Sequence, residues 1–327
     1  MIKNKKIIPT LAIVISILLL FTLFSGCIDD IPDDPNTHIR SITHGGLERT
    51  YRIHIPPSFN KTIQMPLVLV LHGGGGTAEG MEEQLTLGGF NNLSDKKGFI
   101  VVYPNGIEKR WNDCRKNISY RTHQEKIDDV GFISTLIDNI TEEFNINPGR
   151  VYVTGMSNGA MMSYRLACEI SEKIAAIAPV TGAIPEDIIS QCSPSKPVSV
   201  IAISGTDDPL VPWEGGDIKS LFLHKPLGKV LSVPDSVNYW AIHNNCSPMP
   251  NITWLPDLDP RDDTRVRREV YGEGDEGTKV ILYAIEGGGH TWPDGLQYLS
   301  ESLIGKTCHD INANEVIWEF FTESERV

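Results

Sequence analysis

The stretch VYVTGMSNGAMMSYRLACE, residues 151–169, decides the fold of this 327-residue chain. Its first three residues are β-branched or aromatic, which predicts a buried strand, whereas residues 160–168 are rich in good helix formers. Ser157 therefore falls where a strand turns into a helix. A turn this sharp leaves no room for side chains at the flanking Gly155 and Gly159. The pattern predicts a strained turn that exposes the serine hydroxyl.

The N-terminal 37 residues differ from the rest of the chain. Residues 1–26 join three lysines to an apolar run and end in small residues before Cys27, which is typical of a lipoprotein signal peptide. We therefore expect lipidation at Cys27 and an exported, cell-surface or extracellular protein. An uncleaved anchor is the alternative, because about 20 apolar residues can span a bilayer. Residues 27–37 predict a lipid-anchored acidic linker, followed by one folded domain over 38–327.

Net charge limits the classes of partner. The chain has 29 basic and 42 acidic residues and a net charge of −13. Without the three lysines of the predicted signal peptide, the net charge is about −16. This balance disfavours nucleic acid and anionic membrane surfaces, so we expect membrane contact through the N-terminal lipid only. Oligomeric state is not predicted.

Cysteines and glycosylation sequons are compatible with export. The sequence leaves the disulfide pairing open among the cysteines beyond Cys27, which are Cys114, Cys168, Cys192, Cys246 and Cys308. Burial of Cys168 as an apolar residue is the alternative to a disulfide. Six Asn-x-Ser/Thr sequons lie at Asn60, Asn92, Asn117, Asn139, Asn245 and Asn251.

Alternating strands and helices predict the α/β class. Continuously apolar runs are typical of parallel strands covered on both faces. Such a run lies at 66–71, and further strands are predicted at 99–103, 151–153, 197–203 and 279–285. Helical patterns between them place helices on both faces of a mostly parallel sheet. Two extended runs around Gly45-Gly46 predict an antiparallel N-terminal hairpin.

The loops after two of the predicted strands carry the partners that serine chemistry needs. One strand leads to Asp207 and Asp208, and a later one leads to a Gly-rich loop with His290. Because the carboxyl ends of parallel strands share one edge of a sheet, we expect these side chains near Ser157. Chemistry alone does not choose between the two aspartates. The order of serine, acid and histidine is that of the α/β-hydrolase fold.

A Gly-rich loop, residues 72–76, follows the strand at 66–71. Its backbone N–H groups can approach a ligand closely, so we expect Gly74 to supply one oxyanion donor. The amide of Asn158, directly after the serine, is expected to supply the other. No Lys-Ser/Thr pair follows the glycines, which argues against a phosphate loop. His72 is expected to support this loop structurally.

Several linked motifs resemble those of a known family. In chain order they are LHGGGGTAEGM, YPNG, RWNDC, DDVGFI, GMSNGAMMSYRLAC, GTDDPLVPW, GGGHTWP and EVIWEFF, over roughly residues 40–322. Together they resemble the polyhydroxybutyrate depolymerase/feruloyl esterase family of exported serine esterases with an α/β-hydrolase fold. The resemblance implies Ser157 as nucleophile, Asp208 as the acid of the triad and His290 as base. It implies no metal and no organic cofactor.

The expected activity is hydrolysis of carboxylic esters through an acyl-enzyme. Feruloyl or acetyl esters of plant polysaccharide and hydroxyalkanoate oligomers all remain open as substrates. A peptidase or a dienelactone-type hydrolase on the same fold is one alternative, and a noncatalytic surface lipoprotein that acts as a binding module is another. Trp213 and Trp292 flank the acid and base motifs and are expected to form apolar walls for the substrate, with packing of the loops as the alternative.

Overall fold

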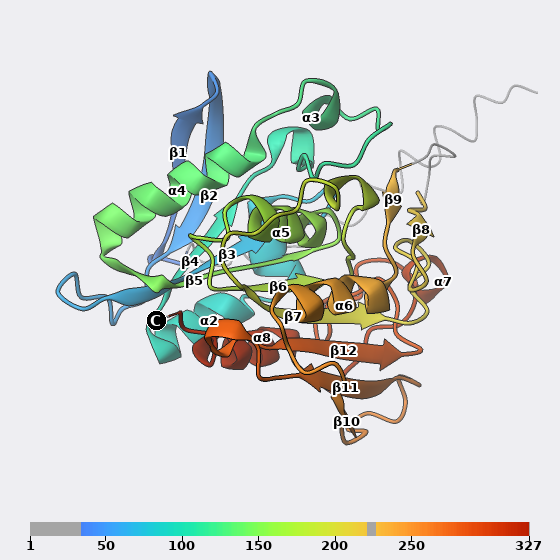
Figure 1. Ribbon diagram of the computed structural model, residues 1–327. Coiled ribbons are helices and arrows are strands. Elements are labelled where there is room, and N and C mark those ends of the chain that lie inside the picture. The colour runs from blue at the N-terminus through green and yellow to red at the C-terminus, as the bar shows by residue number, and fades with distance from the viewer. Residues whose placement is uncertain (1–33, 221–226, 327) are drawn as a thin grey trace, which may run out of the picture. The chain divides into compact units, whose positions relative to one another are not determined.

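A ten-stranded sheet forms the centre of the structure, a computed structural model that describes residues 34–220 and 227–326 (Figure 1). Its order is β1-β2-β4-β3-β5-β6-β7-β12-β11-β10. The strands are β1 (Thr37–His44), β2 (Leu47–His54), β3 (Met65–Leu71), β4 (Ile100–Pro104), β5 (Ile146–Met156), β6 (Ala176–Val180), β7 (Ser199–Gly205), β10 (Asn251–Trp254), β11 (Arg265–Tyr271) and β12 (Val280–Glu286). A separate ribbon pairs β8 (Gly216–Asp217) with β9 (Lys229–Val230).

The six central strands, from β4 to β12 in the sheet order, are parallel, and both edges are antiparallel. The edge made of β1 and β2 is the predicted hairpin, with Gly45 and Gly46 at positive φ in its turn. The other edge consists of β10 and β11, which pair antiparallel with each other, and β11 pairs antiparallel with β12. In β11, Val266 is buried while the preceding Arg265 is exposed.

Helices cover both faces of the sheet, as the sequence predicts, and the α/β class is confirmed. The α-helices are α2 (Gly89–Lys97), α3 (Arg121–Gln124), α4 (Asp129–Phe144), α5 (Asn158–Glu169), α6 (Val233–His243), α7 (Glu301–Ile304) and α8 (Ala313–Thr322). Short turns of other helix types are η1 (Gly80–Leu85), η2 (Ile107–Lys109), η3 (Glu186–Ile188) and η4 (Asp275–Gly277). In Figure 1, α4, α5 and α6 lie on one face, and α2 and α8 lie on the other.

The alternating side chains of β3 divide between two apolar cores. Leu67 and Leu69 pack into the core that α4, α5 and α6 cover, whereas Val68 and Val70 belong to the core under α2 and α8. Every residue of β3 is buried. A strand with two buried faces gains from apolar residues at each position, which explains its continuous apolar run.

The predicted signal peptide, lipidation site Cys27 and most of the acidic linker lie outside the described residues. Within the part that is described, the structure contains no helix with the length and apolar character needed to cross a bilayer. A disulfide joins Cys168, near the end of α5, to Cys192. Cys114, Cys246 and Cys308 are free thiols. The sequence left open whether Cys168 forms a disulfide or is buried as an apolar residue, and in the structure it does both.

Two adjacent aspartates at the start of α4 have different roles. Asp128 caps the helix, because its carboxylate accepts from the Gly131 amide at 2.9 Å. Asp129 is instead fully buried and forms an ion pair with Arg49 of β2 at 2.6 Å. Its other oxygen accepts from the Asn112 amide at 2.7 Å. Asp129 therefore joins the N-terminal hairpin to the loop that precedes α3.

Replacing Asp129 by alanine is expected to lower the free energy of unfolding by about 3–5 kcal/mol, because Arg49 would remain buried without its counter-charge. Asp138→Ala on the same helix is the matched control. The Asp138 side chain is 62% exposed and pairs with Lys173, and such surface pairs contribute about 0–1 kcal/mol. Urea denaturation of both variants measures the difference. Equal losses in the two variants would contradict the role given to Asp129.

Candidate active site

Ser157 lies in the turn between β5 and α5 with φ 56° and ψ −115°. Residues other than glycine are strained in this region of backbone space. A Cβ at Gly155 would lie 2.8 Å from the Leu71 carbonyl oxygen, and one at Gly159 would lie 2.4 Å from the same atom. No side chain fits at such distances. The two glycines are present for lack of space, which is the reason that the sequence suggested.

The serine and the loops of the predicted acid and base leave the sheet at the same edge. Met156 pairs with Val180 of β6, Val180 pairs with Ile203 of β7, and Ile203 pairs with Tyr283 of β12. These residues form one row across four parallel strands. The chain beyond this row carries Ser157 after β5, the acid after β7 and the histidine after β12. Parallel pairing therefore gathers residues that are far apart in the sequence.

His290 and Asp208 are in direct contact. The Nδ1 atom of His290 lies 2.7 Å from Oδ2 of Asp208, and both residues are buried. The other oxygen, Oδ1, accepts from the amides of Leu210 and Val211 at 2.8 and 2.9 Å. Asp207 is exposed and its carboxylate accepts from the neighbouring threonine hydroxyl. Residue chemistry alone did not distinguish the two aspartates, but the structure does, because only Asp208 contacts His290.

The base loop is held through its backbone. The His290 amide donates to the Ile304 carbonyl at 2.6 Å, and the Tyr298 hydroxyl donates to the His290 carbonyl at 3.0 Å. The Asp207 amide donates to the Gly288 carbonyl, which ties the acid loop to the base loop. The structure therefore brings Asp208 and His290 together. Among the described residues, it shows no hydrogen bond from the Ser157 hydroxyl to His290.

The Gly-rich loop lies beside the serine. A Cβ at Gly73 would be 3.6 Å from the Ser157 Cβ, and one at Gly74 would be 3.4 Å from a guanidinium nitrogen of Arg110. Within this loop, Gly73 is thus the glycine that approaches the serine, and Gly74, the predicted oxyanion donor, is the next residue. Asn158 is the first residue of α5, where backbone N–H groups have no partner within the helix.

His72 supports the Gly-rich loop as a neutral imidazole. Its Nδ1 atom lies 2.7 Å from the Gly73 carbonyl, to which it donates, and its Nε2 atom accepts from the Gly106 amide at 2.9 Å. Burial lowers the pKa of His72 from 6.5 to about 4, and the positive charge of Arg110 adds to this effect. A neutral ring can both donate and accept, so the loop is held from two sides.

The loop after η2 clamps the residue that follows the serine. The Trp111 amide donates to Oδ1 of Asn158 at 2.8 Å, and the Asn158 side-chain amide donates to the Trp111 carbonyl at 3.1 Å. The indole of Trp111 donates to the His72 carbonyl at 2.9 Å. Trp111 therefore joins both predicted oxyanion segments. Sequence reasoning missed this contact, although the RWNDC motif contributed to the resemblance.

The two predicted substrate walls lie in different environments. Trp292 is fully buried, packs edge-on against Phe90, and donates its indole N–H to Asn314 at 3.2 Å. Its ring belongs to the core beneath α8. Trp292 therefore packs the loop, the alternative given for it, and does not form a wall for the substrate. Trp213 is partly buried and packs against the other core.

A cavity of about 540 Å³ borders the loop after Trp111. Polar and charged side chains line it, including Arg115, His123 and Arg165, whereas Ser157 and His290 do not. We assign the ester no place there. No group of three or more His, Cys, Asp or Glu placed to hold a metal ion occurs in the described ranges. Asp259, in the segment between β10 and β11, pairs with Arg261 at 2.7 Å.

Comparisons with known proteins identify similar sequences. The family model described as "Esterase PHB depolymerase" matches residues 49–210. "Putative esterase NocK" of Nocardia uniformis subsp. tsuyamanensis is 29% identical over 293 residues, which are 88% of this chain and 83% of that protein. "Feruloyl esterase B" of Piromyces equi is 27% identical over 254 residues, which are 74% of this chain and 42% of that protein. The chain thus spans less than half the length of the second relative.

A solved structure has a similar fold. The acetyl xylan esterase from Aspergillus awamori superposes with a TM-score of 0.55 and 15% identity, and the match covers 88% of this chain and 99% of that one. At this identity the likeness concerns the fold alone. It agrees with the predicted α/β-hydrolase architecture.

His72 is expected to make stability depend on pH. Between pH 6.5 and about 4 the unfolded chain binds a proton at this residue and the folded chain does not, so stability falls as pH falls. The stability advantage of the wild type over His72→Gln should therefore shrink by about 3 kcal/mol from pH 7 to pH 4. Urea denaturation across this range measures it. Parallel stability curves for the two proteins would contradict the assignment.

Proposed function

We propose that the chain, a carboxylic-ester hydrolase similar to the PHB depolymerase-type esterases, works as an exported serine esterase through an acyl-enzyme. The single observation that supports this mechanism best is the 2.7 Å contact between His290 and Asp208. It lies at the sheet edge where the strained turn presents Ser157. In nucleophilic catalysis, a serine in a strained turn acts as the nucleophile, and a buried pair of carboxylate and imidazole acts as its base.

In the proposed reaction, Nε2 of His290 takes the proton of the Ser157 hydroxyl as its oxygen attacks the ester carbonyl. The imidazolium then gives that proton to the leaving alcohol, and water repeats the cycle on the acyl-enzyme. Asp208 binds Nδ1, which keeps Nε2 directed toward the serine and offsets the transient positive charge. The two backbone amides that hold the Asp208 carboxylate fix its orientation.

The developing oxyanion would be bound by two backbone amides, those of Asn158 and Gly74. The approach of the Gly-rich loop to the Ser157 Cβ supports this placement. Each such donor contributes on the order of 3 kcal/mol to stabilisation of the transition state. No step in this scheme calls for a metal or an organic cofactor.

Substrate class and location are proposed on separate grounds. The names of relatives point to feruloyl and acetylxylan esters, and the family model points to hydroxyalkanoate esters. Export rests on the composition of residues 1–26, with lipidation at Cys27 as the proposed anchor. The disulfide between Cys168 and Cys192 supports it, because disulfides persist in oxidising compartments. The half-buried Trp213 stays a proposed contact of the substrate.

Ser157→Ala is expected to lower the rate of p-nitrophenyl acetate hydrolysis by about 1,000-fold or more, because no other group replaces the nucleophile. Ser58→Ala, at an exposed position before β3, is the matched control and should keep full activity. A fluorophosphonate probe should label the wild type on Ser157 and leave the Ser157 variant unlabelled. Activity above a few per cent in that variant would exclude the assignment.

The wild type also separates the remaining alternatives. Faster cleavage of amides or lactones than of aryl esters would favour a peptidase or a dienelactone-type hydrolase. A protein that neither hydrolyses esters nor accepts the probe would favour a binding module. Among methyl ferulate, acetylated xylan and hydroxybutyrate oligomers, we expect the natural class to give the highest kcat/KM.

A further inference from the structure

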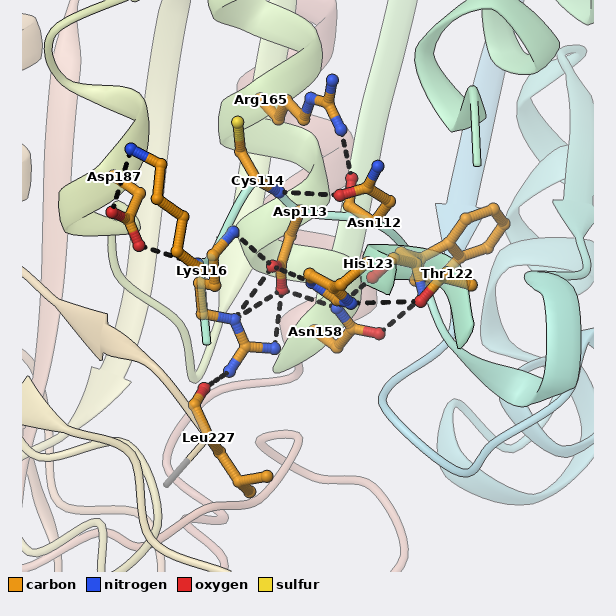
Figure 2. A network of polar contacts seen from close by, with 12 residues as sticks. Asn112, Asp113, Cys114, Lys116, Thr122, His123, Asn158, Arg165, Asp187 and Leu227 are labelled. Atoms are coloured by element: carbon orange, nitrogen blue, oxygen red, sulfur yellow. Dashed lines mark hydrogen bonds and ion pairs between the residues drawn. The ribbon is translucent and has the colours of Figure 1, made fainter. Parts of the chain in front are cut away.

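Asp113 is a fully buried carboxylate outside the proposed triad (Figure 2). Its Oδ1 atom lies 3.0 Å from Nε2 of His123, and its Oδ2 atom lies 2.7 Å from Nη2 of Arg115. Burial alone would raise the pKa of Asp113, but the positive charge of Arg115 and the contact with His123 hold that pKa well below its ordinary range. The residue is therefore an anion at the pH of any ordinary assay.

The third partner of this anion is the residue next to the proposed nucleophile. The side-chain amide of Asn158 donates to Oδ2 of Asp113 at 2.6 Å. Hydrogen bonds to a charged group are shorter and stronger than those between neutral groups. Together with its two bonds to Trp111, this contact gives the Asn158 side chain three partners within a buried space. Figure 2 shows Asp113 at the centre of these groups.

Asp113 is also held independently of the turn at Ser157. Arg115 donates to the Leu227 carbonyl, so it connects the network to the segment before β9. His123 belongs to α3 and also contacts the Thr122 hydroxyl. A carboxylate fixed from two sides can hold a third group in place. The group that it holds here, Asn158, carries the backbone amide proposed as an oxyanion donor.

We propose that Asp113 is a positioning residue for the oxyanion hole, acting through its hydrogen bond to the Asn158 side chain. This inference rests on the proposed function, since it gives Asp113 a role only through the amide of Asn158. Asp113 itself touches no reacting atom. Loss of Asp113 should misplace the Asn158 amide, which donates to the oxyanion. The bound substrate carries no oxyanion yet, so the loss should weaken stabilisation of the transition state more than it weakens binding of the substrate.

Asp113→Asn is the principal test. An amide carries no charge and presents a donor where the carboxylate presents its second acceptor, so Asn158 loses its charge-assisted hydrogen bond and keeps at best a weaker neutral one. We expect kcat for p-nitrophenyl acetate to fall about 10- to 100-fold while KM changes less than about twofold. A trifluoromethyl ketone, which forms a tetrahedral adduct with an oxyanion, should lose affinity by a similar factor.

Asp187→Asn is the matched control, because its carboxylate holds the same loop without touching Asn158. Oδ2 of Asp187 accepts from the Lys116 amide at 2.8 Å. The same substitution there should leave kcat and the affinity for the ketone unchanged. Thermal unfolding of both variants compares their stability. If both variants lose kcat in proportion to their loss of stability, Asp113 is merely structural and the inference is overturned.

Asn158→Ala keeps the inference testable if Asp113→Asn does not fold, since it leaves Asp113 paired with Arg115 and His123. It should show the same selective loss of kcat. In the double variant, Asp113→Asn should add little to the loss of kcat caused by Asn158→Ala, because Asn158→Ala has already removed the bond between the two side chains. Fully multiplicative losses, or unchanged kcat in Asn158→Ala, would overturn the inference.

The experiments distinguish a failure of the role given to Asp113 from a failure of the proposed function. If the wild type hydrolyses the ester and Ser157→Ala does not, the proposed function stands, and unchanged kcat in Asp113→Asn would overturn only the role of Asp113. If the wild type hydrolyses no ester and accepts no fluorophosphonate, the proposed function fails, and the inference that depends on it is overturned with it.

Discussion

The close approach of β3 to the turn after β5 is the constraint on which the site depends. The Leu71 carbonyl lies so near Gly155 and Gly159 that neither position accepts a side chain. This contact forces Ser157 into a backbone conformation that an unconstrained chain avoids. The same contact places the Gly-rich loop, which continues directly from Leu71, against the serine. One approach of two backbones thus accounts both for the strained turn at the partly buried Ser157 and for the nearby backbone of the Gly-rich loop.

A strained turn persists only where its surroundings hold it. Here support comes from the loop after η2, which contacts the turn at Asn158 and the Gly-rich loop at His72 through Trp111. That loop has little regular structure of its own, so its position depends on buried charges. Asp129 and Arg49 fix its start, and Asp113 fixes its centre. Polar contacts outside the triad therefore contribute to holding the serine in place.

The sequence predicted those features that depend on neighbours in the chain. The elbow around Ser157, the apolar strands and the N-terminal hairpin follow from local patterns, and the strand order places the acid and base on one edge. Features that depend on distant contacts were missed or misplaced. Trp292 is core because α8 covers it, and Asp129 meets Arg49 across 80 residues. The roles of the triad residues themselves stay predictions.

The use of a carboxylate at position 113 follows from the number of donors around it. Asn158, Arg115 and His123 all point N–H groups into a space from which water is excluded. A carboxylate has lone pairs for all of them, whereas an amide or a hydroxyl would leave at least one donor unmet at a cost of about 1–3 kcal/mol. Once Arg115 is buried there, a neutral residue would also leave its charge unpaired. The anion and its donors therefore specify one another, and the side chain of Asn158 is left with a single favourable orientation.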